Sequence, residues 1–183
     1  MERCGVPTPV LYLDFDGVLN SDAWFQNHRP SGCLEEVIDP VLAARVQCIV
    51  EATGCRIVVC STRRLHHGEG RLASALGAFH IPMHGCTPPT HQDRRVEAIL
   101  AHAAELPPGT RWVVLDDMVG PNHVEGAGGY AVTPDDGVTE ADAARVIELL
   151  TGSPQPVTRT FETSEEEFRR FMGFLSTFVG PAQ

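Results

Sequence analysis

Asp14 and Asp16 stand two positions apart in the segment LYLDFDGVLNS, where an apolar run gives way to a glycine. In an extended backbone, residues i and i+2 project to the same side, so both carboxyl groups can face one substrate. One aspartate could then act as a nucleophile while the other gives and takes a proton. Gly17 would allow a tight turn after the pair. The alternative is a strand that simply ends in common turn-forming residues.

Two other apolar runs also end in side chains that carry oxygen. The run CRIVVC leads into Ser61 and Thr62, and the run RWVVLD ends in Asp116, which Asp117 follows. Clustered carboxylates repel one another unless a cation lies among them, and their oxygen atoms suit a hard ion such as Mg²⁺. Hydroxyl groups and an arginine are the donors that a phosphoryl group requires. Because Arg94–Arg95 opens the helix predicted before the last run, these residues together have the parts for phosphoryl transfer.

The hydrophobic pattern predicts alternating strands and helices that bring these residues together. Apolar residues at helical spacing predict helices over residues 40–54 and 93–106, and Thr139 with Asp142 forms a capping-box pattern ahead of another. Strands that are apolar on both faces and separated by helices indicate a parallel sheet covered on two sides, so the fold class is α/β. Ligands bind beyond the carboxyl ends of such strands. The predicted strands are Val10–Phe15, Cys55–Cys60 and Arg111–Asp116, with a fourth over Gly129–Val132.

The segments between these elements carry weaker patterns. Residues 20–36 are expected to be irregular, and residues 64–91 mostly so apart from a short helix over 70–79. The C-terminal stretch has apolar residues three or four positions apart, which predicts an amphipathic helix. We expect this helix to pack on the domain, with a homodimer surface or a cover over the site as alternatives. The predicted parts are a catalytic domain over 1–152, with a flap at 20–39 and a short insertion at 64–91, and a linker and helix over 153–183.

Composition narrows the function classes. The 183 residues include 14 Lys and Arg against 24 Asp and Glu, giving a formal net charge of −10. Such a charge repels polyanions, so nucleic acid is expected as a partner only if it is the substrate. No apolar run approaches the length of a membrane span, and the first ten residues do not resemble an export signal. The expectation is a cytoplasmic protein without a membrane partner.

The order of these motifs resembles the haloacid dehalogenase (HAD) superfamily of phosphohydrolases. Its D-x-D-G motif is similar to DFDG, its apolar strand ending in Ser or Thr to IVVCS, its basic helix start to Arg94 or Arg95, and its acidic strand end to VVLDD. A closer likeness is to the small HAD domain of bacterial RNA-repair (Swiss Army Knife) proteins. Those domains typically read DVDGVLN, SSWR, RGxEI and LDD, where this chain has DFDGVLN, STRR, RVEAI and LDD. Arg63 therefore replaces a tryptophan, and Val96 replaces a glycine, which favours aligning Arg95 with the basic residue.

The resemblance implies a three-layer Rossmann-like fold with a small or absent cap, and a Mg²⁺-dependent phosphatase that forms an aspartyl-phosphate. The substrate would be a nucleotide or other small metabolite, or a phosphorylated nucleic-acid end. The alternative is a non-catalytic HAD-like module that binds phosphate or a partner. The implied roles are Asp14 as nucleophile, Asp16 as general acid and base, Ser61, Thr62 and Arg95 (or Arg94) as phosphate-binding residues, and Asp14, Asp16 (through its main-chain carbonyl) and Asp116 or Asp117 as Mg²⁺ ligands.

Overall fold

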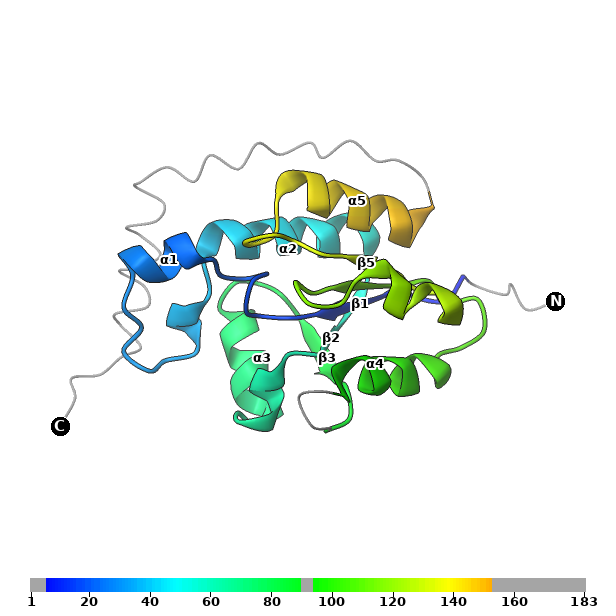
Figure 1. Ribbon diagram of the computed structural model, residues 1–183, viewed down its shortest axis with the longest axis horizontal. Coiled ribbons are helices and arrows are strands. Elements are labelled where there is room, and N and C mark those ends of the chain that lie inside the picture. The colour runs from blue at the N-terminus through cyan, green and yellow to red at the C-terminus, as the bar shows by residue number, and fades with distance from the viewer. Residues whose placement is uncertain (1–5, 90–93, 153–183) are drawn as a thin grey trace.

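The computed structural model describes residues 6–89 and 94–152, and these contain one parallel sheet between two layers of helices (Figure 1). The strand order is β3-β2-β1-β4-β5, and every neighbouring pair is parallel. The chain therefore has the α/β, Rossmann-like architecture that the sequence predicts. The strands are β1 (Val10–Leu13), β2 (Arg56–Val59), β3 (Met83–Cys86), β4 (Trp112–Leu115) and β5 (Tyr130–Val132).

The register of the central strands decides where the polar side chains emerge. Leu13, the last residue of β1, pairs with Val59 of β2 on one side and with Leu115 of β4 on the other. The three central strands therefore end at the same level. The residues that follow them leave the sheet side by side at its carboxyl edge, where parallel α/β sheets bind ligands.

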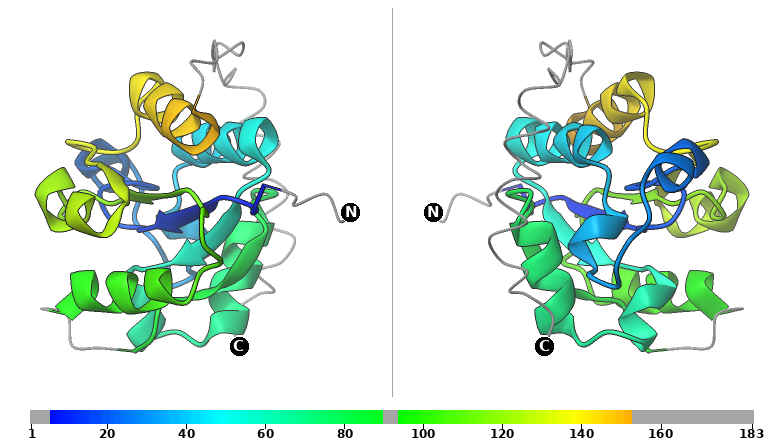
Figure 2. Two further views of the ribbon diagram at one scale, coloured as in Figure 1. Left: turned by 90° about the vertical axis from the view of Figure 1, so that its right-hand side faces the viewer. Right: turned by 90° about the vertical axis from the view of Figure 1, so that its left-hand side faces the viewer.

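Alternate strand residues pack against opposite helix layers. Leu11 and Leu13 of β1 share a core with α2 (Pro40–Thr53), α3 (Glu69–Gly77) and α5 (Glu140–Thr151). Val10 and Tyr12 point the other way, into a second core with Ile99 of α4 (Arg95–Ala104). Figures 1 and 2 show α2 and α5 together on one side of the sheet and α4 on the other. Both faces of the sheet are thus buried.

The helix ends follow the capping signals in the sequence. Asp39 caps α2, because its Oδ1 accepts a hydrogen bond from the main-chain nitrogen of Val41 at 2.8 Å, and the helix ends at Gly54. The predicted capping box of α5 is confirmed: Thr139 and Asp142 each accept a hydrogen bond from the other's main-chain nitrogen. These caps fix where α2 and α5 begin.

Two predicted irregular segments prove to contain regular structure. Residues 20–36 include the helix α1 (Asp22–Asn27), capped by Ser21, and a 3₁₀ turn begins at Glu35. In residues 64–91 the predicted short helix over 70–79 is confirmed as α3, and the edge strand β3 is the element that was not predicted. The sequence MHGC of β3 gives no apolar run because an edge strand has one neighbour and its side chains are only partly buried.

The flap predicted over residues 20–39 begins and ends at neighbouring points. The main-chain nitrogen of Asp39 donates a hydrogen bond to the carbonyl of Leu19 at 2.8 Å. Within the flap, Trp24 is buried, stacks on His28 and donates from its indole nitrogen to the carbonyl of Glu36. The predicted C-terminal helix lies outside the described residues, and no helix within them is long and apolar enough to cross a membrane.

Candidate active site

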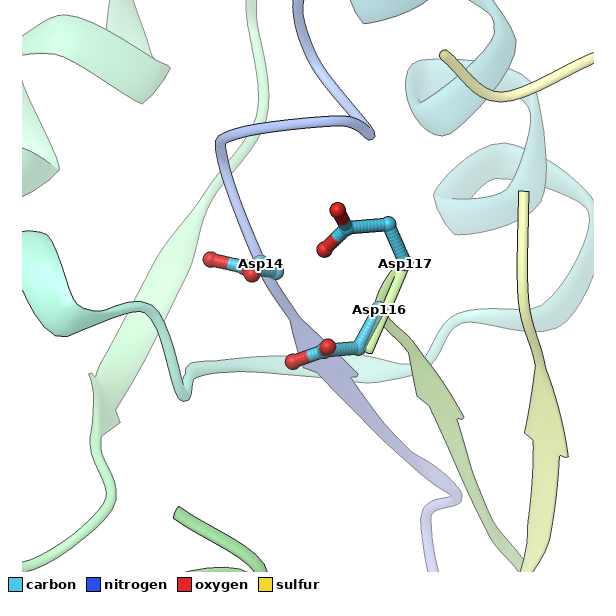
Figure 3. A group of neighbouring side chains, drawn as sticks. All are labelled: Asp14, Asp116 and Asp117. Carbon is cyan, nitrogen blue, oxygen red and sulfur yellow. The ribbon is translucent and has the colours of Figure 1, made fainter. Parts of the chain in front are cut away.

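Three aspartates meet where β1 and β4 end. Asp14 follows β1, and Asp116 and Asp117 follow β4, its neighbour in the sheet. One carboxylate oxygen from each residue lies within 4.8 Å of the other two, and Asp117 turns its carboxyl group toward Asp14 (Figure 3). Asp14 is only 1% exposed and Asp116 is fully buried. The register of the sheet thus produces the acidic cluster expected from the strand ends.

The surroundings of Asp14 make its negative charge costly. Burial and, after it, the nearby charge of Asp116 raise the pKa of its carboxyl group to about 6, against the opposing effects of Arg95 and Ser61. Burial also raises the pKa of Asp117. A divalent cation among these carboxylates would relieve the repulsion, and oxygen ligands of this kind suit Mg²⁺. The donor set therefore fits a hard divalent metal.

Arg95 supplies a positive charge to this cluster. Its Nη1 donates a hydrogen bond to Asp116 Oδ2 at 2.7 Å and another to Asp14 Oδ2. The side chain is 12% exposed, so the contact is largely shielded from water. Arg94, by contrast, is exposed and pairs with Glu97 on the surface at 3.4 Å. Of the two arginines that the sequence left open, the structure brings Arg95 to the aspartates.

Ser61 and Thr62 follow the end of β2, the strand that pairs with β1. Ser61 is fully buried, and its hydroxyl oxygen accepts a hydrogen bond from the main-chain nitrogen of Arg63 at 3.3 Å. That contact caps the 3₁₀ turn Thr62–Leu65. Ser61 also lies close enough for its hydroxyl to lower the pKa of Asp14 through hydrogen bonding. Thr62, the first residue of the turn, is partly buried.

Arg64 holds this loop in place. Its guanidinium donates hydrogen bonds to the carbonyls of Cys60 at 2.6 Å, Ser61 at 2.7 Å and Thr87 at 3.2 Å. These contacts join the end of β2 to the segment that follows β3. The position of Ser61 is therefore fixed by the hydrogen bonds from Arg64 as well as by the strand that leads into it.

The turn after Asp16 requires a glycine for two reasons. Gly17 has a φ of 69°, in the left-handed region that glycine adopts without strain. A Cβ atom at this position would also lie 2.6 Å from Oδ2 of Asp117. The turn that carries Asp16 therefore packs directly against one of the predicted metal ligands.

Asp16 points to partners that the sequence did not predict. Arg63 donates to its two carboxylate oxygens, from Nη2 to Oδ1 at 2.6 Å and from Nε to Oδ2 at 3.0 Å. Asn20 Nδ2 donates to the same Oδ1 at 3.0 Å. Both residues are visible in the motifs DFDGVLN and STRR, but the sequence does not show that the two loops face each other. The side chain of Asp16 lies outside the group formed by the other three aspartates.

A comparison with models of known protein families finds one that matches the part of the chain containing these residues. The family model for the HAD domain in Swiss Army Knife RNA repair proteins matches residues 10–143. The match spans all five strands and all of the predicted site residues. A search of curated proteins found no match.

Proposed function

The chain belongs to the family of HAD domains found in Swiss Army Knife RNA repair proteins, and we propose that it is a Mg²⁺-dependent phosphatase that hydrolyses a phosphomonoester through an aspartyl-phosphate. The observation that carries this proposal is the meeting of three carboxylates within 4.8 Å, two of them buried and both in contact with Arg95. Buried like charges are costly, and they are expected where a cation and an anionic substrate complete the site.

Asp14 is the proposed nucleophile. One of its oxygens accepts a hydrogen bond from the main-chain nitrogen of Phe15 at 2.7 Å, which orients the carboxylate at the end of β1. Its other oxygen faces Arg95, whose charge offsets the repulsion between a carboxylate and an approaching phosphate. Attack forms a bond from Asp14 to phosphorus and breaks the ester bond to the leaving oxygen.

Asp16 is the proposed general acid and base. In the first step it gives a proton to the leaving oxygen, so that the product departs as an alcohol. In the second step it takes a proton from a water molecule that attacks phosphorus. Inorganic phosphate is released and the carboxylate of Asp14 is restored. The proton returned to Asp16 balances the cycle.

Mg²⁺ would be held by Asp14, by Asp116 or Asp117, and by the main-chain carbonyl of Asp16. When bound, the ion supplies positive charge that screens the nucleophile from the substrate and stabilises the charge that develops on the phosphoryl oxygens. Ser61, Thr62 and Arg95 are the proposed donors to those oxygens. The surface contact of Arg94 with Glu97 does not support such a role for Arg94.

Two substrate classes fit this chemistry. The family description names RNA repair, which favours a phosphorylated nucleic-acid end. The net charge of −10 opposes binding of a long polyanion, which favours a nucleotide or another small phosphorylated metabolite. A short terminal stretch of nucleic acid that contacts only the arginines near the site would satisfy both observations.

Phosphate release from a panel of substrates tests the proposal. The panel contains nucleoside monophosphates, sugar phosphates and oligonucleotides with a 3′- or 5′-phosphate, each with Mg²⁺ or with a chelator. We expect release that requires Mg²⁺ and that falls on the order of 10³-fold or more in Asp14→Asn. Glu140→Gln, an exposed acid-to-amide change on α5, serves as the matched control. Absence of release from every compound, or equal release by Asp14→Asn, would favour a non-catalytic phosphate-binding module.

A further inference from the structure

Arg63 links the loop after β2 to the loop after β1. It lies in the 3₁₀ turn after β2, and the carboxyl group that it contacts, Asp16, lies in the turn after β1. The contact is two-pronged, with Nη2 2.6 Å from Oδ1 and Nε 3.0 Å from Oδ2. A forked contact of this kind fixes the orientation of a carboxylate as well as its position.

Asp16 is also held from its own loop. Asn20 is buried, and its Nδ2 donates to Asp16 Oδ1 at 3.0 Å. The Oδ1 atom of Asn20 in turn accepts a hydrogen bond from the main-chain nitrogen of Gly17 at 3.0 Å. Asn20 therefore fixes the turn, while Arg63 reaches the carboxyl group from the neighbouring strand end.

The exposure of Asp16 explains why a contact with Arg63, in addition to the one with Asn20, helps to fix its side chain. The side chain of Asp16 is 49% exposed, and that of Arg63 is 23% exposed. A half-exposed aspartate on a tight turn can occupy several rotamers, and ordering it has an entropic cost. A general acid has to lie within about 2.6–3.2 Å of the oxygen that receives its proton. Arg63 selects one orientation before the substrate arrives, which removes that cost from the reaction. It can hold the protonated group as well as the carboxylate, because Oδ1 alone accepts from Nη2 at 2.6 Å and from Nε at 3.2 Å, and Oδ2 can then carry the proton.

We propose that Arg63 is a positioning residue that holds the carboxyl group of Asp16 where it meets the leaving oxygen of the substrate. This inference rests on the proposed function, in which Asp16 protonates that oxygen. The two arginines then serve different groups: Arg95 contacts Asp14 and Asp116, whereas Arg63 contacts Asp16. Arg63 occupies the position where the domains that this chain resembles typically carry tryptophan.

Such a role predicts a dependence on the leaving group. Protonation matters most when the departing oxygen is strongly basic, as in an alkyl phosphate, and least when it is stabilised, as in 4-nitrophenyl phosphate. Loss of substrate binding or of folded structure would instead affect both substrates equally. The ratio of the two kcat/KM values therefore separates positioning from the other roles, because kcat/KM includes the departure of the leaving group.

The experiment compares the full chain with Arg63→Gln and Arg63→Lys, and uses Arg145→Gln and Arg145→Lys, on the surface of α5, as controls. We expect Arg63→Gln to lower kcat/KM about 10- to 100-fold for an alkyl phosphate and less than about 3-fold for 4-nitrophenyl phosphate. Arg63→Lys keeps the charge without the fork and should give an intermediate loss. In an Asp16→Asn background, Arg63→Gln should have no further effect.

The outcomes divide cleanly between the two proposals. An equal loss on both substrates, a change confined to KM, or no change in Arg63→Gln would overturn the role of Arg63 while leaving an active phosphatase in place. An additive loss in the Asp16→Asn background would overturn it as well. An unmodified chain that releases phosphate from neither substrate nor from the wider panel would overturn the proposed function, and the positioning role with it.

Discussion

Arg95 lies against Asp116, with Nη1 2.7 Å from Oδ2, and this contact joins the start of α4 to the end of β4. The same nitrogen also donates to Asp14, so a single guanidinium serves two buried carboxylates. In the metal-free protein, the positive charge of Arg95 offsets the negative charges of both carboxylates through these direct hydrogen bonds. The stability of the metal-free protein should therefore depend strongly on it.

Replacing Arg95 by glutamine leaves two buried carboxylates without their ion-pair partner. We expect Arg95→Gln to lower the free energy of unfolding of the metal-free protein by about 2–4 kcal/mol at pH 7.5. Arg94→Gln removes an exposed pair with Glu97 and should change it by less than about 0.5 kcal/mol. Urea unfolding in the presence of a chelator measures both. Equal effects of the two substitutions would contradict the burial of the Arg95 contacts.

Asp14 should destabilise the metal-free protein at neutral pH. Its pKa is raised from 3.8 to about 6 by burial and by Asp116, so the folded chain holds this proton more tightly than the unfolded chain does. The contribution of this group to stability is therefore greatest below about pH 4 and is lost as the pH rises through 6. We expect Asp14→Asn to stabilise the metal-free protein by about 1–3 kcal/mol at pH 7.5.

The gain from Asp14→Asn should be much smaller at pH 4, where Asp14 is already largely protonated in the folded chain. Thermal unfolding with a chelator at the two pH values measures the difference. Glu140→Gln, on the surface, is the control for the loss of a carboxylate. A stabilisation by Asp14→Asn that is the same at both pH values would show that its origin is not the titration of this carboxyl group.

Gly17 and Gly54 form a matched pair for testing the turn beside Asp117. Both have a positive φ, 69° and 62° respectively, but a Cβ atom would meet Asp117 at 2.6 Å in the first case and no atom within 4 Å in the second. Gly54→Ala should cost about 1 kcal/mol of stability from backbone strain alone. Gly17→Ala should cost more, because the carboxyl group of Asp117 has to move.

The response to Mg²⁺ should separate the two alanine variants further. Mg²⁺ is expected to raise the melting temperature of the unmodified chain and of Gly54→Ala by similar amounts, because a ligand that binds only the folded state stabilises it. In Gly17→Ala the rise should be smaller, since a predicted metal ligand is displaced. Differential scanning fluorimetry over a Mg²⁺ titration measures this. Equal responses of the two variants would place Asp117 outside the metal site.

The sequence predicted those parts of the fold whose signals are local. The strands β1, β2 and β4 are buried on both faces and therefore appear as continuous apolar runs. Strand β3, with the sequence MHGC, lies at the sheet edge and has no such run, so it was missed. Residues immediately after the central strands could be placed together because the carboxyl ends of parallel strands share one edge.

The contacts between loops could not be predicted in this way. Arg63 is four positions beyond the end of β2, and its direction depends on the 3₁₀ turn that Ser61 caps. Whether Arg94 or Arg95 reaches the aspartates likewise depends on how the first turn of α4 faces the sheet. Both questions concern side-chain direction rather than residue type, and the spacing of residues in the sequence does not contain that information.

The strand order also bears on when the site can exist during synthesis of the chain. Arg95 and Asp14 are 81 positions apart in the sequence, and β4, which brings Asp116, pairs with β1 only after β2 and β3 have been made. A nascent chain that has emerged only as far as β3 therefore has Asp14, the proposed nucleophile, but lacks Arg95, Asp116 and Asp117. The proposed phosphate chemistry would therefore require the second half of the sheet, which leaves the ribosome last.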